Sequence, residues 1–126
     1  MLKSLVEALG IEERCIPRIA TGFGAGMGRH GETCGALVGA TMALGLKYGR
    51  EDVSDSAAKA NTYDKVESLL QVFKDKYGIV VCRDLIGCDF QTPEGNERFK
   101  RENLNVECAK FVGFTAREAL RIASDE

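Results

Sequence analysis

The sequence predicts an all-α fold, a single compact domain of five to six helices around one central helix made of small residues. Three observations predict it: apolar residues recur at helical spacing, capping residues and stop glycines delimit the segments, and one segment is apolar on every side. The single β-branched run, 79–81, is too brief to build a sheet. At 126 residues, with no linker and no internal repeat, residues 1–126 form one domain.

The expected helices follow from their local start and stop signals. They span 2–9, 12–21, 34–48, 56–77, 92–102 and 105–123, with one further helical turn at 82–86. Gly10, Gly49, Gly78 and Gly87 stand where helices end. Thr92-Pro93 is a cap followed by a first-turn proline, whereas Pro17 is tolerable only in the first turns of 12–21.

The longest segment, 56–77, carries the clearest periodicity. Its apolar stripe is Tyr63, Val66, Leu70, Phe73 and Tyr77, at spacings of 3, 4, 3 and 4. Such spacing places all five side chains on one face, so this face is expected to cover the core.

The segment 34–48 is the expected central helix. Gly35, Gly39 and Ala43 recur at every fourth position and form a face that another helix can approach closely. Larger apolar residues fill its other sides. A helix of this kind lies in the core or at a subunit interface, so homodimerisation is an open expectation.

Charge and apolar run length argue against two kinds of partner, nucleic acid and the membrane interior. The formal net charge is −2, and the cluster Arg98, Lys100 and Arg101 is interpreted as a solvated helix face, so no nucleic-acid partner is expected. The longest uncharged run, 33–46, has 14 residues, fewer than the roughly 20 of a spanning helix. No secretory signal opens the chain, so we expect a cytoplasmic protein with no membrane insertion.

The cysteines are numerous and widely spaced. There are five of them, Cys15, Cys34, Cys82, Cys88 and Cys108. The odd number argues against a fully paired secreted framework. Because no two are separated by only two residues, zinc ribbons, thioredoxin-like motifs and covalent haem attachment lose their usual signal. Any shared thiol site must therefore be assembled by the fold.

A glycine-rich stretch, 22–31, precedes the central helix. Its Gly26-x-Gly28-x-x-Gly31 spacing formally matches a dinucleotide fingerprint, but neither a preceding strand nor a parallel-sheet series is expected here. We interpret it as a tight turn in which glycines adopt positive φ.

Three cysteines are expected at helix starts. With Thr33 as the N-cap, Cys34 is the first helical residue, where the helix dipole lowers a thiol pKa while the neighbouring Glu32 raises it. Cys82 opens the turn at 82–86, and Cys108 lies in the first turn after an Asn105 cap. The three predict one shared site; the alternative is that they are small buried packing residues.

Three stretches carry a resemblance: Gly31-Glu32-Thr33-Cys34-Gly35-Ala36-Leu37-Val38-Gly39, then Cys82-Arg83-Asp84-Leu85-Ile86-Gly87, then Glu107-Cys108. They resemble the family of small redox-active proteins named for its C-GCAxxG-C-C pattern, over about residues 5–119. The resemblance implies an all-helical domain, four signature cysteines and related sequence in the split-Soret cytochromes c. By position, the last three signature cysteines are Cys34, Cys82 and Cys108.

The sequence departs from this pattern in two places. Thr33 stands where the pattern has glycine. The family's first cysteine lies in a helix upstream of the segment matching 2–9, and this chain begins after that point, so we expect either a shortened chain or a variant with three of the four. Cys15 and Cys88 are the available substitutes.

Three functions remain open. In the first, thiol–disulfide redox chemistry with an unknown redox partner, Cys34 is the nucleophile, Cys82 or Cys108 resolves, and Arg83 favours a thiolate at Cys82. This reading makes the protein a thiol–disulfide oxidoreductase.

In the second function, Cys34, Cys82 and Cys108 bind a metal or an iron–sulfur cluster for electron transfer, with Cys88 or a partner completing the ligands. His30, the one histidine, is either a ligand or proton donor beside Cys34 or a solvent-exposed loop residue. In the third, the protein is a non-catalytic helical binding module.

Overall fold

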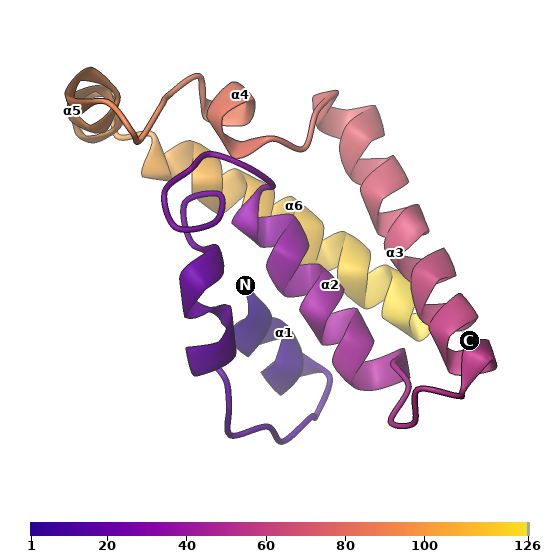
Figure 1. The fold of residues 1–126 in the computed structure, drawn as a ribbon. Coiled ribbons are helices and arrows are strands. Elements are labelled where there is room, and N and C mark those ends of the chain that lie inside the picture. Colours follow the sequence, from indigo (N-terminus) through magenta and orange to yellow (C-terminus); the bar gives the residue numbers. More distant parts are fainter. Residues whose placement is uncertain (126) are drawn as a thin grey trace.

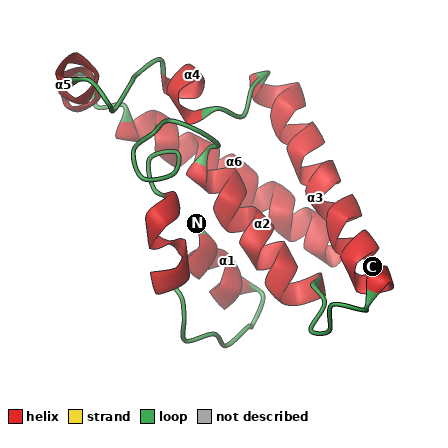
Figure 2. Cartoon of the chain, viewed as in Figure 1, coloured by secondary structure: helices red, strands yellow, loops and turns green. Residues whose placement is uncertain are grey.

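The computed structural model of the protein describes residues 1–125, and within them it contains six α-helices, one 3-10 helix and no strand (Figures 1 and 2). The elements are α1 (Leu2–Ala8), η1 (Arg18–Phe23), α2 (Gly35–Tyr48), α3 (Ser56–Tyr77), α4 (Cys82–Ile86), α5 (Pro93–Arg101) and α6 (Asn105–Ser124). The all-α prediction is confirmed.

Helix α2 is the centre of the fold, as its apolar composition predicts. It packs against α1, η1, α3 and α6, and α3 packs against α6 (Figure 1). Its small residues allow close approach from within the chain: a Cβ on Gly39 would lie 2.8 Å from Met1 Cγ and 3.1 Å from the Leu2 nitrogen. This part of the small-residue face therefore receives the chain's own N-terminal segment.

An aromatic cluster closes the core between α3 and α6. The Phe73 and Tyr77 rings of α3 lie 4.8 Å apart between centroids, and Tyr77 meets Phe111 and Phe114 of α6 edge-on at 4.9 and 5.4 Å. Tilted and edge-to-face pairs at these distances are favourable beyond the area they bury. The aromatic cluster thus joins the two longest helices.

The predicted stripe on α3 is right at its C-terminal half and wrong at its start. Tyr63 is 63% exposed, whereas Leu69, which the stripe omitted, is fully buried beside Phe73. Positions 69 and 70 both satisfy a three-or-four spacing from Val66, so periodicity alone leaves the choice between them open. Packing of α3 against α2 and α6 determines that position 69 faces the core.

The α-helix expected at 12–21 does not form, so this prediction is wrong. Only the short 3-10 helix η1 forms there, from Arg18, after turns at residues 14–17. Pro17 has no N–H to bond to residue 13, and its ring disfavours the α conformation at Ile16, so an α-helix cannot run through this segment.

Most other helix ends follow local chemistry. The Thr92 side chain accepts a hydrogen bond from the Gly95 N–H at 3.0 Å, and Gly78 and Gly87 end α3 and α4 in the left-handed conformation, with φ of +81° and +62°. Two expected caps are wrong. Cys34 rather than Thr33 is the N-cap of α2, and Leu104 rather than Asn105 that of α6.

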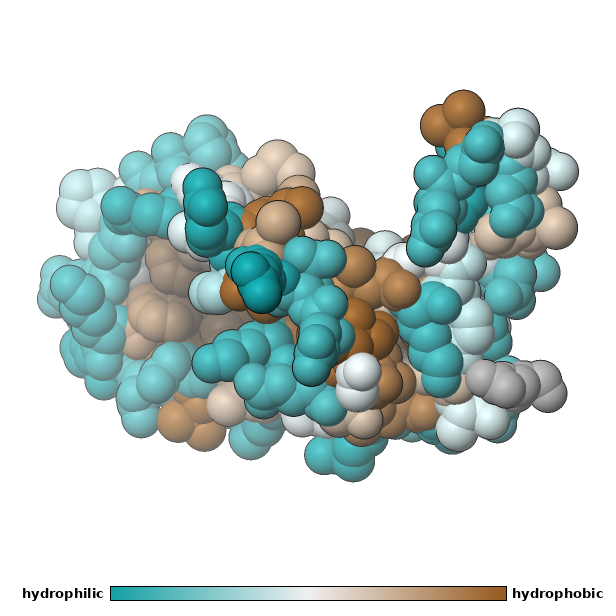
Figure 3. Space-filling model, turned by 90° about the horizontal axis from the view of Figure 1, so that it is seen from below, coloured by the Kyte–Doolittle hydropathy of each residue, from teal (hydrophilic) through white to brown (hydrophobic). Residues whose placement is uncertain are grey.

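Polar side chains cover most of the face shown in Figure 3, and apolar surface gathers near its middle. Within residues 1–125 no helix combines the length and the apolarity that crossing a membrane requires.

Candidate functional site

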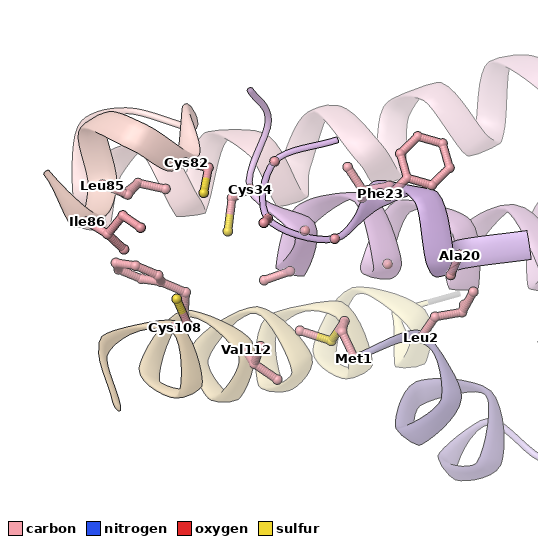
Figure 4. A pocket seen from close by; sticks show the side chains of 18 of the residues that line it. Met1, Leu2, Ala20, Phe23, Cys34, Cys82, Leu85, Ile86, Cys108 and Val112 are labelled. Carbon is pink, nitrogen blue, oxygen red and sulfur yellow. The ribbon is translucent and has the colours of Figure 1, made fainter. Parts of the chain in front are cut away.

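The starts of α2, α4 and α6 lie at the same end of the bundle (Figure 1). Cys34, Cys82 and Cys108, one from each start, line a single pocket of about 470 Å³. Figure 4 shows the three sulfur atoms gathered at one end of this pocket. The fold therefore brings together the three cysteines that the family pattern marks.

Backbone pairing fixes Cys34 relative to Cys82. Thr33 and Val81 form an isolated antiparallel bridge, in which the Cys34 N–H donates to the Val80 carbonyl at 2.8 Å and the Cys82 N–H to the Glu32 carbonyl at 2.6 Å. In this register Cys34 and Cys82 are diagonal neighbours on one face, about 7–8 Å apart in such pairs, and both line the pocket. The bridge also explains the Thr33 correction, because Thr33 is extended and helix α2 begins only after Cys34.

The loop before Cys34 contains a left-handed run. Residues 25–29 all have positive φ, between +52° and +73°, and Gly31 follows with +68°. Ala25, Met27 and Arg29 are the residues in this run that are not glycine, and each costs roughly 1–2 kcal/mol in this conformation. The glycines at 26, 28 and 31 adopt positive φ as expected, whereas Gly24 does not, with φ of −61°.

Hydrogen bonds across the loop hold this run in place. The Gly28 N–H donates to the Gly22 carbonyl and the Glu32 N–H to the Gly26 carbonyl, both at 2.8 Å. A Cβ on Gly26 would lie 2.5 Å from the Glu32 nitrogen, so this position has no room for a side chain. The coiled loop delivers Glu32 and Thr33 to the bridge and thereby positions Cys34.

The thiols are buried and their pKa values rise. Cys34 is 8% and Cys82 9% exposed. Burial raises the pKa of the Cys82 thiol to about 11, and repulsion from the thiolates of Cys34, Cys108 and Cys88 adds to the rise. The expected Arg83 effect is not among its causes.

Burial also raises the pKa of Cys34, although hydrogen bonds from the N–H groups of Ala36 and Leu37 oppose the rise. Burial, followed by repulsion from Cys34, raises the pKa of Cys108, which is half-buried. At neutral pH all three thiols are therefore protonated. The sequence left open whether the pKa of Cys34 is raised or lowered. It is raised, because desolvation outweighs the hydrogen bonds at the start of the helix.

Cys88 is buried beside the site without lining the pocket. Its Sγ donates to the Gly95 carbonyl at 2.7 Å, which attaches the segment after α4 to the start of α5. The fifth cysteine, Cys15, is exposed in the segment before η1. In the part of the chain that the structure describes, all five thiols are free.

The remaining candidates lie at the surface. Arg83 Nη1 lies 3.3 Å from Glu32 Oε1, and it also donates to the His30 carbonyl at 3.5 Å. Both partners of this ion pair are about half exposed. His30 and Thr33 are exposed, and His30 lines a separate shallow hollow beside Gln91 rather than the thiol pocket.

The side chains that could bind a metal ion are histidine, cysteine, aspartate and glutamate. Across residues 1–125, no three or more histidine, cysteine, aspartate or glutamate side chains are grouped so that they could hold one. Cys34, Cys82 and Cys108 share a pocket, but as they stand they do not form a ligand set. The exposed His30 offers no axial ligand to a group bound in that pocket.

The sequence reasoning missed the apolar walls of the pocket. Phe90 and Phe99, which meet edge-on at 5.0 Å, and Phe111 line it together with Leu85 and Val112. Phe90 and Phe99 are the aromatic residues of an otherwise polar stretch, 89–102, and this contrast was the available signal.

Comparison with known proteins identifies one relationship. The model of a family described as "Putative redox-active protein (C_GCAxxG_C_C)" matches residues 1–122. No curated protein and no solved structure gives a significant match.

Proposed function

Since the chain belongs to the C-GCAxxG-C-C family, we propose that it is redox-active and performs thiol–disulfide exchange with Cys34 and Cys82 as the reacting pair. The observation that carries this proposal is the pairing of the two backbones at Thr33 and Val81, which directs both thiols into one pocket. Cys108 faces the pair from α6 as a third thiol (Figure 4).

The exchange balances as a two-electron transfer. Cys34 loses its proton and attacks one sulfur of a substrate disulfide, forming a mixed disulfide and releasing the first substrate thiol. Cys82 loses its proton and attacks the Cys34 sulfur, forming the Cys34–Cys82 disulfide and releasing the second thiol. Two protein thiols are oxidised, and one substrate disulfide is reduced to two thiols that take up the two protons.

The electrostatics of the site favour the two neutral end states over the charged intermediate. Both the protonated dithiol and the disulfide are uncharged, so burial penalises neither, whereas it penalises a thiolate. The raised pKa values make the thiolate scarce at neutral pH, so exchange is slow there and accelerates as pH rises. Disulfide formation requires the two sulfur atoms to close to about 2 Å.

Single cysteine variants test the assignment. Reduced protein is treated with a small disulfide, and adducts are mapped by mass spectrometry. Cys82→Ser is expected to accumulate a mixed disulfide at Cys34, and Cys34→Ser to lose turnover with a dithiol reductant. Cys15→Ser, which changes an exposed cysteine outside the pocket, is the matched control and should cycle normally.

Normal cycling by Cys34→Ser would contradict the proposal. Accumulation of the mixed disulfide in Cys108→Ser, but not in Cys82→Ser, would reassign the resolving thiol to α6.

A further inference from the structure

The thiol pocket extends well beyond the thiols. The three sulfur atoms occupy one end, while Met1, Leu2 and Ala20 line the other (Figure 4). Its volume of about 470 Å³ lies within the range of small-molecule sites. The proposed exchange uses only the end of the pocket that holds the sulfur atoms, and it does not explain the apolar space beyond them.

The side chains that line the pocket are uncharged. Of the described residues that line it, none has a charged side chain, and the terminal amino group of Met1 is the one charged group that a lining residue carries. Glu32 and Arg83, the charged side chains on either side of the bridge, are paired with each other at the surface. A charged ligand entering the pocket would lose hydration without gaining a charged side chain as a partner, which is costly, whereas a neutral apolar ligand would gain from burial.

Depth favours a small molecule over a protein disulfide. Cys34 and Cys82 are almost fully buried, and the backbone of residues 24–26 forms part of the wall around them. A disulfide on a protein surface would reach these sulfurs only after that wall had moved. A narrow ligand can approach along the pocket.

We propose that the substrate is a neutral, apolar, low-molecular-weight disulfide, bound with its sulfurs at the thiol end and its apolar body along the walls. This inference rests on the proposed function and names the substrate class of that reaction. The substrate disulfide is reduced to two thiols as Cys34 and Cys82 are oxidised, and every stable species in the pocket is uncharged.

The test compares two cyclic disulfides that differ in charge alone. Lipoamide ends in a neutral amide and lipoic acid in a carboxylate. Rates are taken in whichever direction proceeds, from reduced protein and disulfide or from oxidised protein and dithiol. Each is divided by the rate of the same probe with free dithiothreitol in the first direction and with oxidised dithiothreitol in the second. We expect lipoamide to react roughly tenfold faster or more.

A charge placed in the pocket wall should reverse this preference. Val112 lines the pocket on α6, so Val112→Lys is expected to bring the lipoamide-to-lipoic-acid ratio to about one or below. The matched control is Ala109→Lys, because Ala109 lies three residues earlier on α6, is exposed and does not line the pocket. This control should keep the original ratio.

Ligand protection gives a second readout that needs no variant. Octanamide, a neutral amide without sulfur, should slow alkylation of Cys34 in the unmodified protein, whereas octanoate at the same concentration should not. Protection by both or by neither would contradict the inference, whether or not Val112→Lys folds.

The outcomes separate the two proposals. Equal normalised rates for lipoamide and lipoic acid, with a Cys34–Cys82 disulfide still forming, overturn the substrate class and leave the proposed function intact. Absence of that disulfide even with the strong oxidant diamide overturns both.

Discussion

Two neighbouring regions of the bundle are built in different ways. In the aromatic cluster, the long regular helices α3 and α6 are joined through Phe73, Tyr77, Phe111 and Phe114. Around the thiols, a 3-10 helix, a left-handed loop and a five-residue helix meet near one isolated bridge between Thr33 and Val81, and Phe111 belongs to both regions because it also lines the thiol pocket. The first arrangement buries apolar rings at little conformational cost, whereas the second accepts backbone strain to hold two sulfur atoms in one place.

The difference indicates that the two regions have different roles, one in stability and the other in placing the sulfur atoms. Burial of aromatic rings is among the largest single contributions to stability, whereas residues in sparsely populated conformations cost of order 1–3 kcal/mol each and persist where the surroundings hold them. We therefore expect substitutions inside the aromatic cluster, away from the pocket, to change stability first, and substitutions around the thiols to change sulfur chemistry as well.

The largest expected effect is in the aromatic cluster. Phe73→Ala removes a fully buried ring and should lower the free energy of unfolding by about 3–5 kcal/mol, measured by urea denaturation. The folded fraction should oxidise its thiols at the normal rate. Tyr63→Ala, on the same helix but exposed, is the control and should change stability by less than about 0.5 kcal/mol. A Phe73→Ala protein with altered thiol chemistry would contradict these separate roles.

Gly26→Ala, in the loop before Cys34, is expected to have the next largest effect. Its Cβ would lie 2.5 Å from the Glu32 nitrogen at a φ of +69°, so we expect a loss of roughly 2–4 kcal/mol together with slower disulfide formation. Gly45→Ala, on α2 with nothing within 4 Å of the new Cβ, is the matched substitution and should stabilise by about 0.5–1 kcal/mol. If both variants oxidised at the unmodified rate, the loop would have no part in positioning Cys34.

A smaller effect of opposite sign is expected at Ala25. Ala25→Gly relieves a left-handed alanine with φ of +52°, and after the entropy cost of glycine in the unfolded chain it should stabilise by about 0.5–1 kcal/mol. Ala60→Gly, at an exposed position inside α3, should instead destabilise by about 1 kcal/mol. Destabilisation of both by equal amounts would mean that the loop stores no strain at Ala25.

The last effect is a pH dependence. Because burial raises the pKa of Cys82 from 9.0 to about 11, the folded protein holds this proton more tightly than the unfolded chain does. Its contribution to stability is fully present below about pH 9 and is lost as pH rises towards 11. The unfolding free energy of the unmodified protein should therefore fall more steeply over this range than that of Cys82→Ala. Parallel curves would show that the thiol is not buried in solution.

The helices that the sequence predicted well are those whose ends are set locally. Helix α3 spans the expected 56–77, since Asp55 caps its start and Gly78 can adopt positive φ at its end. Helix α5 follows Thr92 and Pro93 in the same way. Such signals act within a few residues and need no knowledge of the rest of the fold.

The features that sequence reasoning missed depend on contacts between distant segments. The N-cap position of Cys34 follows from a bridge to Val81, nearly fifty residues away. The left-handed conformation of Met27 and Arg29 follows from hydrogen bonds across the loop, because neither residue favours it alone. The three signature cysteines were predicted to share a site, but the apolar pocket around them is lined jointly by residues of α4, α5 and α6, and local patterns do not show that these residues meet.

The most direct test of the central claim, a redox pair of Cys34 and Cys82, counts and maps thiols. Anaerobically purified protein is alkylated before and after mild oxidation, its intact mass is measured, and the modified peptides are mapped. The account predicts five alkylated thiols in the reduced protein and three after oxidation, with the loss at Cys34 and Cys82. Five thiols that stay free after oxidation, or a disulfide that leaves out Cys34, would contradict it.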